Sequence, residues 1–596
     1  MGTSVVASVS TADTQSFTPD NICRSVTQGK PYIVVGQQAS FTKNHAKWFI
    51  IGAYAPPNSD YFKTTEWPLK GPAYDILVIS DPITDDKVLP KTHSLKNTTK
   101  SKLINVRACR GEYEPASFVI RTGDLGLENV RITVSSLQPV NRVSAAREIE
   151  SKYIDIRVVK PWYQAGESQR NDKHGVSIPE PEMLIKKKTL TPELLLHDDA
   201  LVQVDHTYQV NVIRDFKATG DKDRLMPFNC EKHSNKQIWI TLKVPEDSKP
   251  GKYEGSIHIR PKNASSTRIQ LVLTVLPFEL KQPKLYYTMY YLNNLKQSKN
   301  HDLFHFKTKP SMFKDFLDIK SHGINNVIIS HRKLDLDVLN DILDLKDSAG
   351  LDRTSLYLTA WPKLATDHES LKKLNKDVAT LVGFARSRMI QKTYYYAVDE
   401  LKSELLPLER AMLQTIQEAG AMTMTATDQS FLGIIDDLLD LAIFRGPPGR
   451  GIVESVHKKK NKIWIYGNPQ GGEEKPAVYR YNYGFLLSRL QVDGIAIYAY
   501  QCEMGQDPWD DFDHKKYRDH MMTYPTPTGP IPTVQWEGLR EGIDDIRYLA
   551  TLSDLAQKSG KERDVASFIA GLDFTQSPNS IRQRIIEKIL SLKNNN

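Results

Sequence analysis

After residue 284 the sequence alternates short apolar runs with amphipathic runs, and this alternation constrains the fold more than any other feature of the chain. The apolar runs are rich in β-branched and aromatic residues, which is typical of buried strands. There are eight such runs, at residues 285–292, 326–330, 355–361, 393–400, 421–428, 440–444, 462–468 and 494–501. Helical patterns between them include residues 311–321, 334–348, 369–389, 404–419 and 477–490.

Strand and helix alternating eight times predict a (β/α)₈ TIM-type barrel, which we place at residues 285–505. Three of the helical runs are followed by Gly323, Gly350 and Gly420, and glycine often closes a helix in the left-handed conformation. In barrels of this kind the active site lies at the C-terminal ends of the strands. Polar and aromatic residues at those ends are therefore the first candidates for function.

The fourth predicted strand ends in two adjacent carboxylates, Asp399 and Glu400. Neighbouring strand residues point to opposite faces, so the two can share one site only if the strand is ending there. An Asp-Glu pair also arises by chance in a chain with 71 acidic residues. Its position at the end of a barrel strand makes this pair a candidate catalytic dyad.

Aromatic, amide and acidic side chains occur at several other strand ends. Aromatic faces stack on pyranose rings, and Asn, Gln and Tyr side chains bind sugar hydroxyls. Each residue alone could be ordinary packing, because aromatic residues favour strands. Together they predict a sugar site lined by Tyr291, Trp361, Tyr396, Asp428, Tyr466, Asn468, Tyr498, Tyr500 and Gln501.

The chain before residue 281 has short β runs separated by turns rich in Gly, Pro and Asn, which predicts an antiparallel β-sandwich over residues 31–280. The runs are residues 32–35, 48–53, 76–79, 116–121, 130–135, 153–159, 238–244, 255–259 and 269–276. A proline-flanked stretch, residues 276–283, is the predicted domain boundary. We expect an N-terminal extension at residues 1–30, and a C-terminal loop and helices at residues 506–596 that pack on the barrel.

The composition argues against several other classes of protein. Of the 596 residues, 40% are hydrophobic and 25% are charged, which is typical of a folded chain with more than one core. No run approaches the roughly 18 to 20 apolar residues of a membrane span. The first residues lack the basic and apolar segments of a signal peptide. Because no phosphate-binding loop or dinucleotide fingerprint is found, no cofactor is expected.

The net charge of +8 raises the possibility of a nucleic-acid partner. The basic runs at residues 186–188 and 458–460 lack interleaved aromatics, so we interpret them as solvated loops and expect no nucleic acid. A positive field would also attract an acidic or sulfated glycan. No metal is expected, because no ligand spacing connects the four cysteines, Cys23, Cys109, Cys230 and Cys502. Compartment, disulfide pairing and oligomeric state stay open.

The adjacent carboxylates also predict a type of mechanism. A retaining glycosidase with a protein nucleophile needs two carboxyl groups about 5 Å apart on opposite sides of the anomeric carbon, and an inverting enzyme needs about 6.5 to 9.5 Å. Two neighbours on one strand tip do not easily flank the bond in that way. They suit substrate-assisted hydrolysis, in which a 2-acetamido oxygen of the sugar is the nucleophile. Glu400 would then be the general acid, and Asp399 would hold the acetamido N–H and stabilise the oxazolinium ion.

Two alternatives remain at this stage. A separate protein nucleophile would act on a different polysaccharide, acidic or sulfated, and Glu473, Glu474 or Glu503 in the loops after the last two strands could supply it. The other alternative is a carbohydrate-binding scaffold without catalysis. Under each of these hypotheses the partner is an oligosaccharide or polysaccharide.

Several separated blocks of the sequence resemble glycoside hydrolase family 123 in the same order. They are residues 110–118, 159–166, 239–247, 250–255, 399–400, 468–470, 479–484, 507–509 and 536–549. The resemblance implies a sandwich followed by a catalytic barrel, a β-N-acetylgalactosaminidase-like activity, an adjacent Asp-Glu pair at Asp399 and Glu400, and a secreted, periplasmic or cell-surface location. Leu401 stands where the family usually has proline, and the blocks around Tyr481 and Trp536 are more similar to uncharacterised relatives.

Overall fold

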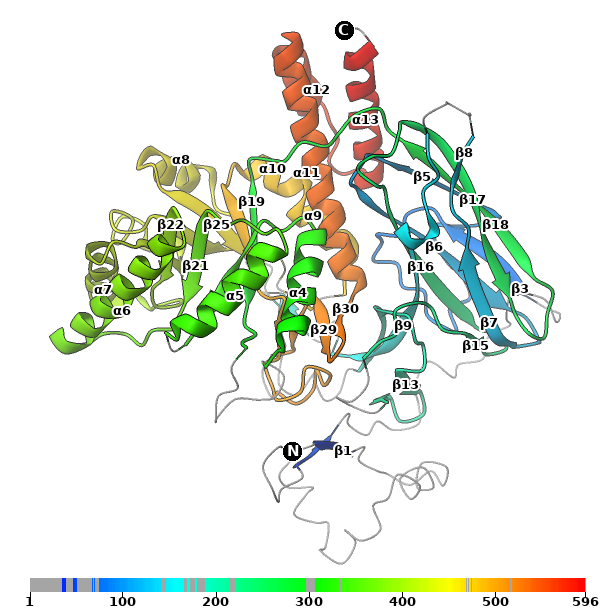
Figure 1. The fold of residues 1–596 in the computed structure, drawn as a ribbon, viewed down its shortest axis with the longest axis horizontal. Helices are drawn as coiled ribbons and strands as arrows, with labels where there is room; N and C mark the ends of the chain where they lie inside the picture. The colour runs from blue at the N-terminus through cyan, green and yellow to red at the C-terminus, as the bar shows by residue number, and fades with distance from the viewer. Residues whose placement is uncertain are drawn as a thin grey trace, which may run out of the picture.

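The computed structural model describes residues 35–38, 47–50, 67, 69, 74–140, 146–165, 169–171, 177–179, 188–214, 220–295, 306–332, 334–467, 469, 471–472, 474–514 and 517–594. A β-rich region and a barrel lie at opposite ends of the molecule, and three C-terminal helices stand between them (Figure 1).

The β-rich region is a sandwich of two sheets. The first has the strand order β12-β9-β16-β6-β3-β4, formed by Thr189–Leu196, Ile154–Gln164, Asn235–Lys243, Tyr113–Thr122, Tyr74–Ile79 and Thr98–Lys100. The second has the order β15-β7-β17-β18-β5, formed by Phe228–Cys230, Leu127–Val134, Gly251–Arg260, Thr267–Val275 and Leu103–Ala108, and β8 (Gln138–Pro139) also pairs with β17. Neighbouring strands are antiparallel except for β18 and β5, which are parallel.

Alternation of side chains builds the core between the two sheets. In β5, for example, Ile104, Val106 and Ala108 are buried whereas Leu103 is exposed. The first sheet is also covered on its other face, where Trp239 packs with Val534 from the C-terminal region and its indole N–H donates to Glu537 at 3.3 Å. The sandwich therefore rests on the rest of the molecule through this sheet.

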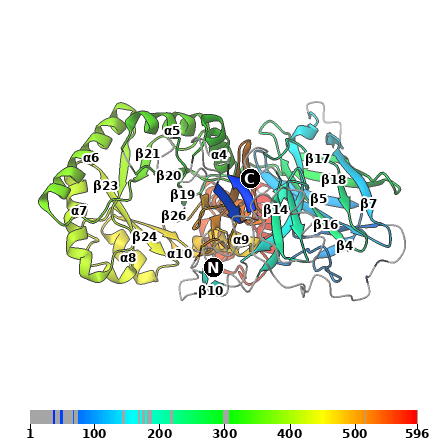
Figure 2. The ribbon, with the colours of Figure 1, turned by 90° about the horizontal axis from the view of Figure 1, so that it is seen from below.

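The barrel is closed and parallel, with eight strands in sequential order (Figure 2). The strands β19 to β26 are Tyr286–Tyr291, Asn326–Ser330, Ser355–Thr359, Lys392–Tyr396, Met422–Thr427, Leu441–Arg445, Lys462–Tyr466 and Gly494–Ile497. The surrounding helices α4 to α10 are Lys309–Ser321, Leu336–Ser348, His368–Ser387, Leu406–Glu418, Arg450–Lys458, Pro476–Tyr483 and Phe485–Leu490. Side chains of Thr308, Asp335 and Asp367 cap α4, α5 and α6 by accepting backbone N–H groups of the first turn.

The fold prediction is confirmed, including all eight barrel strands. The expected helix at residues 477–490 is divided into α9 and α10 at Gly484, where a side chain would lie 2.5 Å from the Arg480 carbonyl and 2.8 Å from that of Gly542. The predicted strand at residues 32–35 lies almost entirely outside the described residues, as do residues 51–53 of the next one. The sequence did not predict every element, and strands β5 and β12 and helix α8 are among those it missed.

The C-terminal helices are α11 (Val534–Ser559), α12 (Glu562–Ala570) and α13 (Pro578–Asn594). Helix α11 packs against α9 with almost no space between the two backbones, because Gly538 and Gly542 lie at the contact. A Cβ atom on Gly538 would come 2.3 Å from the Pro476 carbonyl oxygen, and one on Gly542 would come 2.6 Å from that of Arg480. Only glycine fits at these two positions.

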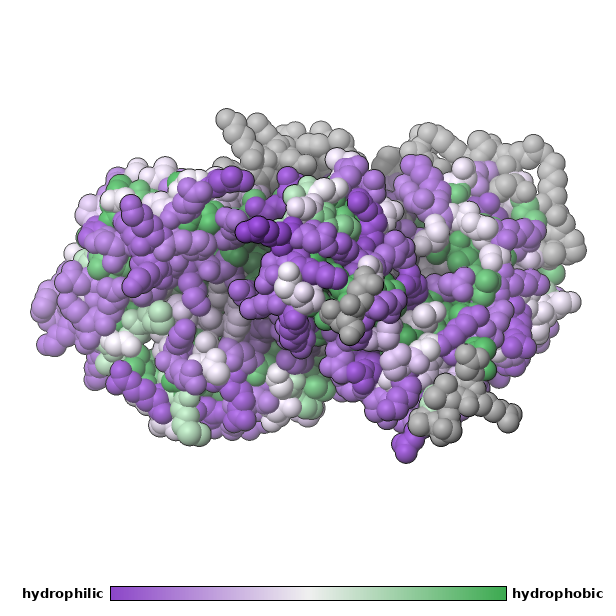
Figure 3. All heavy atoms as spheres, turned by 90° about the horizontal axis from the view of Figure 1, so that it is seen from above, coloured by the Kyte–Doolittle hydropathy of each residue, from purple (hydrophilic) through white to green (hydrophobic). Residues whose placement is uncertain are grey.

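The face seen from above is largely hydrophilic, with apolar residues scattered across it (Figure 3). Among the helices that the structure describes, none combines the length and the apolarity needed to cross a bilayer.

Candidate active site

The fourth barrel strand, β22, leaves the sheet just before the two adjacent carboxylates. Its ladder ends at Tyr396, yet the chain stays against β23, because Ala397 N–H donates to the Met424 carbonyl at 2.9 Å and Glu400 N–H to that of Ala426 at 3.1 Å. Glu400 has a φ of +46°, in the left-handed region. The regular alternation of strand side chains is therefore broken between Asp399 and Glu400, as sharing one site requires.

Asp399 is held by a neutral donor. The Tyr396 hydroxyl donates to Asp399 Oδ1 at 2.6 Å, and the same hydroxyl oxygen accepts from Ala426 N–H at 3.0 Å and from the Tyr290 hydroxyl at 3.2 Å. The Tyr396 hydroxyl thus makes one hydrogen bond as a donor and two as an acceptor, and it orients Oδ1 of Asp399. Asp399 is exposed at the mouth, but the protein encloses it closely enough that loss of hydration raises its pKa, and the Tyr396 hydrogen bond partly offsets that rise.

Glu400 is also exposed at the mouth, and its pKa is raised. Partial burial is the main cause, the charge of Asp399 adds to it, and Arg445 at the end of β24 opposes it. The charges of both carboxylates reach Tyr290 inside the barrel and contribute to its raised pKa, which burial dominates. The two acids therefore act electrostatically on one site, and Glu400 is the one whose neighbours favour a bound proton.

Aromatic side chains line the barrel mouth beside the dyad. The rings of Trp361 and Tyr396 have centroids 6.1 Å apart, those of Tyr290 and Tyr396 also 6.1 Å, and those of Tyr290 and Tyr498 5.2 Å. Tyr466 belongs to the same apolar cluster inside the barrel. This wall offers ring faces and hydroxyl groups near two carboxylates, which is the chemistry a saccharide site needs.

Two residues at this mouth have strained backbones. Trp361, at φ +48°, follows the end of β21, and its indole N–H donates to Ser330 Oγ at 2.8 Å. Glu400, at φ +46°, is the second residue with a strained backbone. A bulky residue in the left-handed region costs about 1 to 3 kcal/mol, and such strain concentrates at functional sites.

The structure corrects three predicted sugar contacts. Tyr291 and Tyr500 lie outside the barrel wall, fully buried, and their hydroxyls donate to Asp315 and Asp318 of α4, each at 2.9 Å. Gln501 is buried as well; its Oε1 accepts from Asn293 Nδ2 at 3.0 Å, and its Nε2 donates to Thr523 Oγ1 at 2.9 Å. Tyr291 and Tyr500 therefore project to the helix side and pack the barrel wall, and Gln501 lies beyond the end of β26 in a buried contact with the segment after the barrel.

Of the other predicted sugar contacts, Asp428 has a clear structural role and Asn468 is not described. Asp428 is exposed after β23, and its carboxylate accepts from Ser430 N–H at 2.8 Å and from Ser430 Oγ at 2.7 Å. It thereby caps the short 3₁₀ helix Gln429–Phe431. Asn468 lies outside the described residues.

Three residues of this mouth were not predicted. Tyr290 could have been found, because alternation along β19 turns residue 290 into the barrel if residue 291 faces the helices. Arg445 ends a strand, and its position alone could have suggested it. His520, whose ring packs on Tyr498 at 5.5 Å between centroids, comes from the segment after the barrel, and no local pattern points to it.

The alternative protein nucleophiles are not supported equally. Glu474 is buried, with 5% of its side chain exposed and its carboxylate paired with Arg518, so it is not free to attack a sugar. Glu503 is half-buried, and Glu473 lies outside the described residues. Across the part of the chain that the structure describes, no cluster of His, Cys, Asp and Glu could hold a metal ion.

Two family models match the sequence. Residues 84–261 match the glycoside hydrolase 123 N-terminal domain, and residues 352–552 match the glycoside hydrolase 123 catalytic domain. No curated protein matches the sequence significantly.

The fold also resembles that of solved structures. A family 123 glycoside hydrolase from Clostridium perfringens, solved in a study of glycolipid glycan hydrolysis, aligns over 87% of this chain and 100% of its own with a TM-score of 0.64 and 15% identity. A Bacteroides ovatus GH5 xyloglucanase has a TM-score of 0.28 at 8% identity, covering 75% and 99% of the two chains. A Thermobacillus composti GH10 xylanase has 0.25 at 10%, covering 39% and 98%. The first likeness shows a shared fold, and the other two are too weak to argue from.

A closed barrel that carries a carboxylate pair at a strand end, and that matches the model of a glycosidase catalytic domain, defines a barrel glycosidase with an N-terminal β-sandwich. Both family models belong to one family, and the same family provides the structure that aligns over 87% of this chain. The chain is a glycoside hydrolase family 123-like protein.

Proposed function

We propose that the protein hydrolyses a β-linked 2-acetamido-2-deoxy-hexoside, such as an N-acetylgalactosaminide, by substrate-assisted catalysis with retention. The observation that carries the proposal is the adjacent pair at the end of β22, where Asp399 is fixed by Tyr396 at 2.6 Å and Glu400 is turned toward the same mouth by its left-handed backbone. The family resemblance favours a secreted, periplasmic or cell-surface place of action.

Glu400 acts as the acid in this scheme. Partial burial and the charge of Asp399 keep a proton on Glu400 at a higher pH than usual, and that proton passes to the glycosidic oxygen as the bond breaks. The acetamido oxygen attacks the anomeric carbon and forms an oxazolinium ion. Glu400, now a carboxylate, then removes a proton from the water that opens this ring, which regenerates the acid.

Asp399 acts on the acetamido group. Its Oδ1 is bound to Tyr396, so Oδ2 can accept the acetamido N–H and orient the carbonyl oxygen for attack. The negative charge stabilises the cation as it forms. The proposal that a protein carboxylate attacks instead is weaker, because Arg518 engages Glu474.

The experiment is inhibition by a thiazoline mimic of the oxazolinium intermediate, measured with an aryl 2-acetamido-2-deoxy-β-galactoside. We expect inhibition at least about 100-fold tighter than the substrate KM, because the mimic resembles the species that the site stabilises. Asp399→Asn keeps the shape but loses the charge, so it should lower kcat by about 10² and weaken the mimic by at least about tenfold.

The matched control substrate is the aryl β-galactoside without the acetamido group, which should not turn over. Turnover of that control, together with a covalent sugar trapped on a protein carboxylate, would replace this mechanism with the protein-nucleophile alternative. Saccharide binding without turnover of any aryl glycoside would indicate the scaffold.

A further inference from the structure

The wall of the barrel mouth at Tyr498 is supported by the loop after β25. Gly471 N–H donates to the Tyr498 carbonyl at 2.6 Å, so this loop lies directly against the end of the eighth strand. A Cβ atom on Gly471 would lie 2.9 Å from the Ala499 carbonyl oxygen, and one on Gly472 would lie 2.3 Å from that of Asp519. The loop is therefore pressed between the end of the eighth strand and residues 519–521.

His520 completes this contact from the other side. It begins the short strand β28 (His520–Met521), and its Nδ1 lies 3.2 Å from the Gly471 carbonyl oxygen while its ring packs edge-on against Tyr498. Burial lowers the pKa of His520 to about 4, so the ring is neutral at ordinary pH. Tyr498 is thus held between the Gly471 backbone and the His520 ring.

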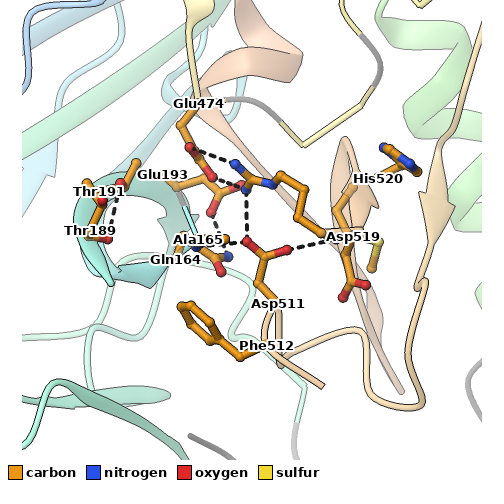
Figure 4. Close-up of polar contacts among 12 residues, drawn as sticks. Gln164, Ala165, Thr189, Thr191, Glu193, Glu474, Asp511, Phe512, Asp519 and His520 are labelled. Carbon is orange, nitrogen blue, oxygen red and sulfur yellow. Dashed lines mark hydrogen bonds and ion pairs between the residues drawn. The ribbon is translucent and has the colours of Figure 1, made fainter. Parts of the chain in front are cut away.

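The segment that carries His520 is fixed by a buried ionic cluster (Figure 4). Arg518 pairs with Glu474, two residues beyond Gly472, and its guanidinium lies 3.3 Å from Asp511 Oδ2. The Asp511 carboxylate also accepts the N–H of Asp519 at 2.7 Å. Arg518 therefore ties the loop after β25 to the segment that bears His520.

The sandwich supplies the other half of the cluster. Asp511 accepts the N–H of Ala165, just after β9, at 2.9 Å. Glu193 of β12, which lies beside Glu474 in Figure 4, accepts from the Trp162 indole N–H at 2.7 Å and from Gln535 at 2.6 Å. The anchor for the mouth wall is therefore built into the first sheet of the sandwich.

We propose that Arg518 and Glu474 are positioning residues for sugar binding: their ion pair clamps Glu474, and with it Gly471 and Gly472, to the sandwich and so fixes Tyr498 in the barrel mouth. This rests on the proposed function only in taking Tyr498 as a sugar contact. The sandwich then shapes the substrate site without touching the substrate.

Charge balance decides which substitution can test the clamp. Three buried carboxylates, Glu193, Glu474 and Asp511, surround one guanidinium, so removing Arg518 would leave them uncompensated and risks unfolding the chain. Glu474→Gln keeps the size of the side chain and breaks the ion pair, and the Arg518 guanidinium still has Asp511 Oδ2 at 3.3 Å as a partner. It is therefore the milder of the two substitutions.

The first measurement is backbone hydrogen exchange, which needs no substrate. In E474Q we expect the amides of residues 471–474 and 498–502 to exchange at least about tenfold faster, because local opening becomes easier. The second is kinetics with the aryl 2-acetamido-2-deoxy-β-galactoside. A displaced Tyr498 weakens ground state and transition state alike, so KM should rise about tenfold while kcat stays within about threefold.

The matched control is Arg582→Lys, which alters a buried arginine of α13 in a different ionic cluster. It should lower the melting temperature yet leave KM and exchange at residues 471–474 unchanged. Unchanged exchange in E474Q, faster exchange with an unchanged KM, or equal effects in the control would each overturn the clamp. If the aryl glycoside is not a substrate, the proposed function fails while the exchange result still decides the clamp.

Discussion

The mouth of the barrel and the junction between the sandwich and the barrel both gather carboxylates, but they neutralise them differently. At the junction each group surrounds an arginine: Arg518 in one cluster, and Arg480 and Arg582 in another, where both contact Asp545. At the mouth the hydrogen bond to Asp399 comes from a phenol, that of Tyr396. The charge of an arginine opposes the rise in pKa that burial causes in a carboxyl group, although burial still dominates at Glu193 and Glu112, whereas a phenol donates a hydrogen bond without adding a charge. The junction is built for cohesion and the mouth for chemistry.

The largest effect should come from the mouth. Glu400→Gln should lower kcat on substrates with poor leaving groups by about 10² to 10⁴, the usual contribution of general acid-base catalysis, without lowering the melting temperature. A dinitrophenyl leaving group, which needs no proton, should lose much less. Equal losses on both substrates would mean that Glu400 binds the sugar and that the contrast with the junction fails.

A substitution at the junction should have the opposite profile, with a loss of stability and an unchanged kcat. Arg582 contacts Asp545 at 2.5 Å and Glu541 at 2.7 Å, with 6% of its side chain exposed. Arg582→Met leaves both acids without this partner, so it should reduce the free energy of unfolding by about 3 to 5 kcal/mol. Urea unfolding measures this loss, and kcat per folded molecule should stay within twofold. A change in kcat as large as that of E400Q would show that the two regions are not separate.

A pH series sharpens the comparison. Glu112 at the junction is fully buried, and burial raises its pKa to about 8, with the charge of Asp544 adding to the rise. A raised folded-state pKa adds stability that is complete below the unfolded value, about 4.5, and is lost as the pH rises through 8. Stability should therefore fall between pH 5 and pH 8.5 by up to about 1.4 kcal/mol per pH unit from this group.

Glu112→Gln is the matched variant for the pH series. Glu112 Oε2 accepts from Cys109 N–H at 2.6 Å and from the Tyr548 hydroxyl at 2.9 Å, whereas Oε1 has no hydrogen-bond partner, so an amide can take its place. We expect E112Q to match the wild type near pH 5 and to be more stable at pH 8.5. The same slope in both proteins would exclude Glu112 as its source.

The smallest effect concerns backbone strain at Trp361. Both W361A and W361G remove the ring, so both should weaken saccharide binding. Only glycine adopts a φ of +48° without steric strain. W361G should therefore be more stable than W361A by about 1 kcal/mol in urea unfolding. A stability loss of several kcal/mol in both variants would make Trp361 a core residue, not a sugar contact.

The barrel was predictable because strand and helix have different periods. Each predicted barrel strand begins within one residue of the observed one, whereas six of the eight predicted ends overshoot, by four residues at Glu400 and at Gln501. The overshoot has a physical cause: the apolar pattern continues into the rim after the backbone has left the ladder. The position of the dyad followed from this pattern, but its left-handed turn did not.

The face of the barrel wall to which a side chain points was harder to predict than the position of the strand. Tyr291 and Tyr500 were expected at the mouth and face the helices, while Tyr290 faces inward, because one step along a strand reverses the side chain. A continuous aromatic run such as Tyr286–Tyr291 hides that parity. Arg518 and His520 could not be inferred at all, since their contacts join segments far apart in the sequence.

The two glycines of α11 have a consequence for how this chain can be divided. Pro476 and Arg480 of α9 touch Gly538 and Gly542 backbone to backbone, so the tail helix completes the barrel's outer layer although the eighth strand ends at Ile497. A fragment that stops near residue 505 would expose the face of α9 that α11 covers, and it should aggregate or fail to fold. The smallest independently folding catalytic unit therefore extends at least through α11, well past the point where the barrel pattern in the sequence stops.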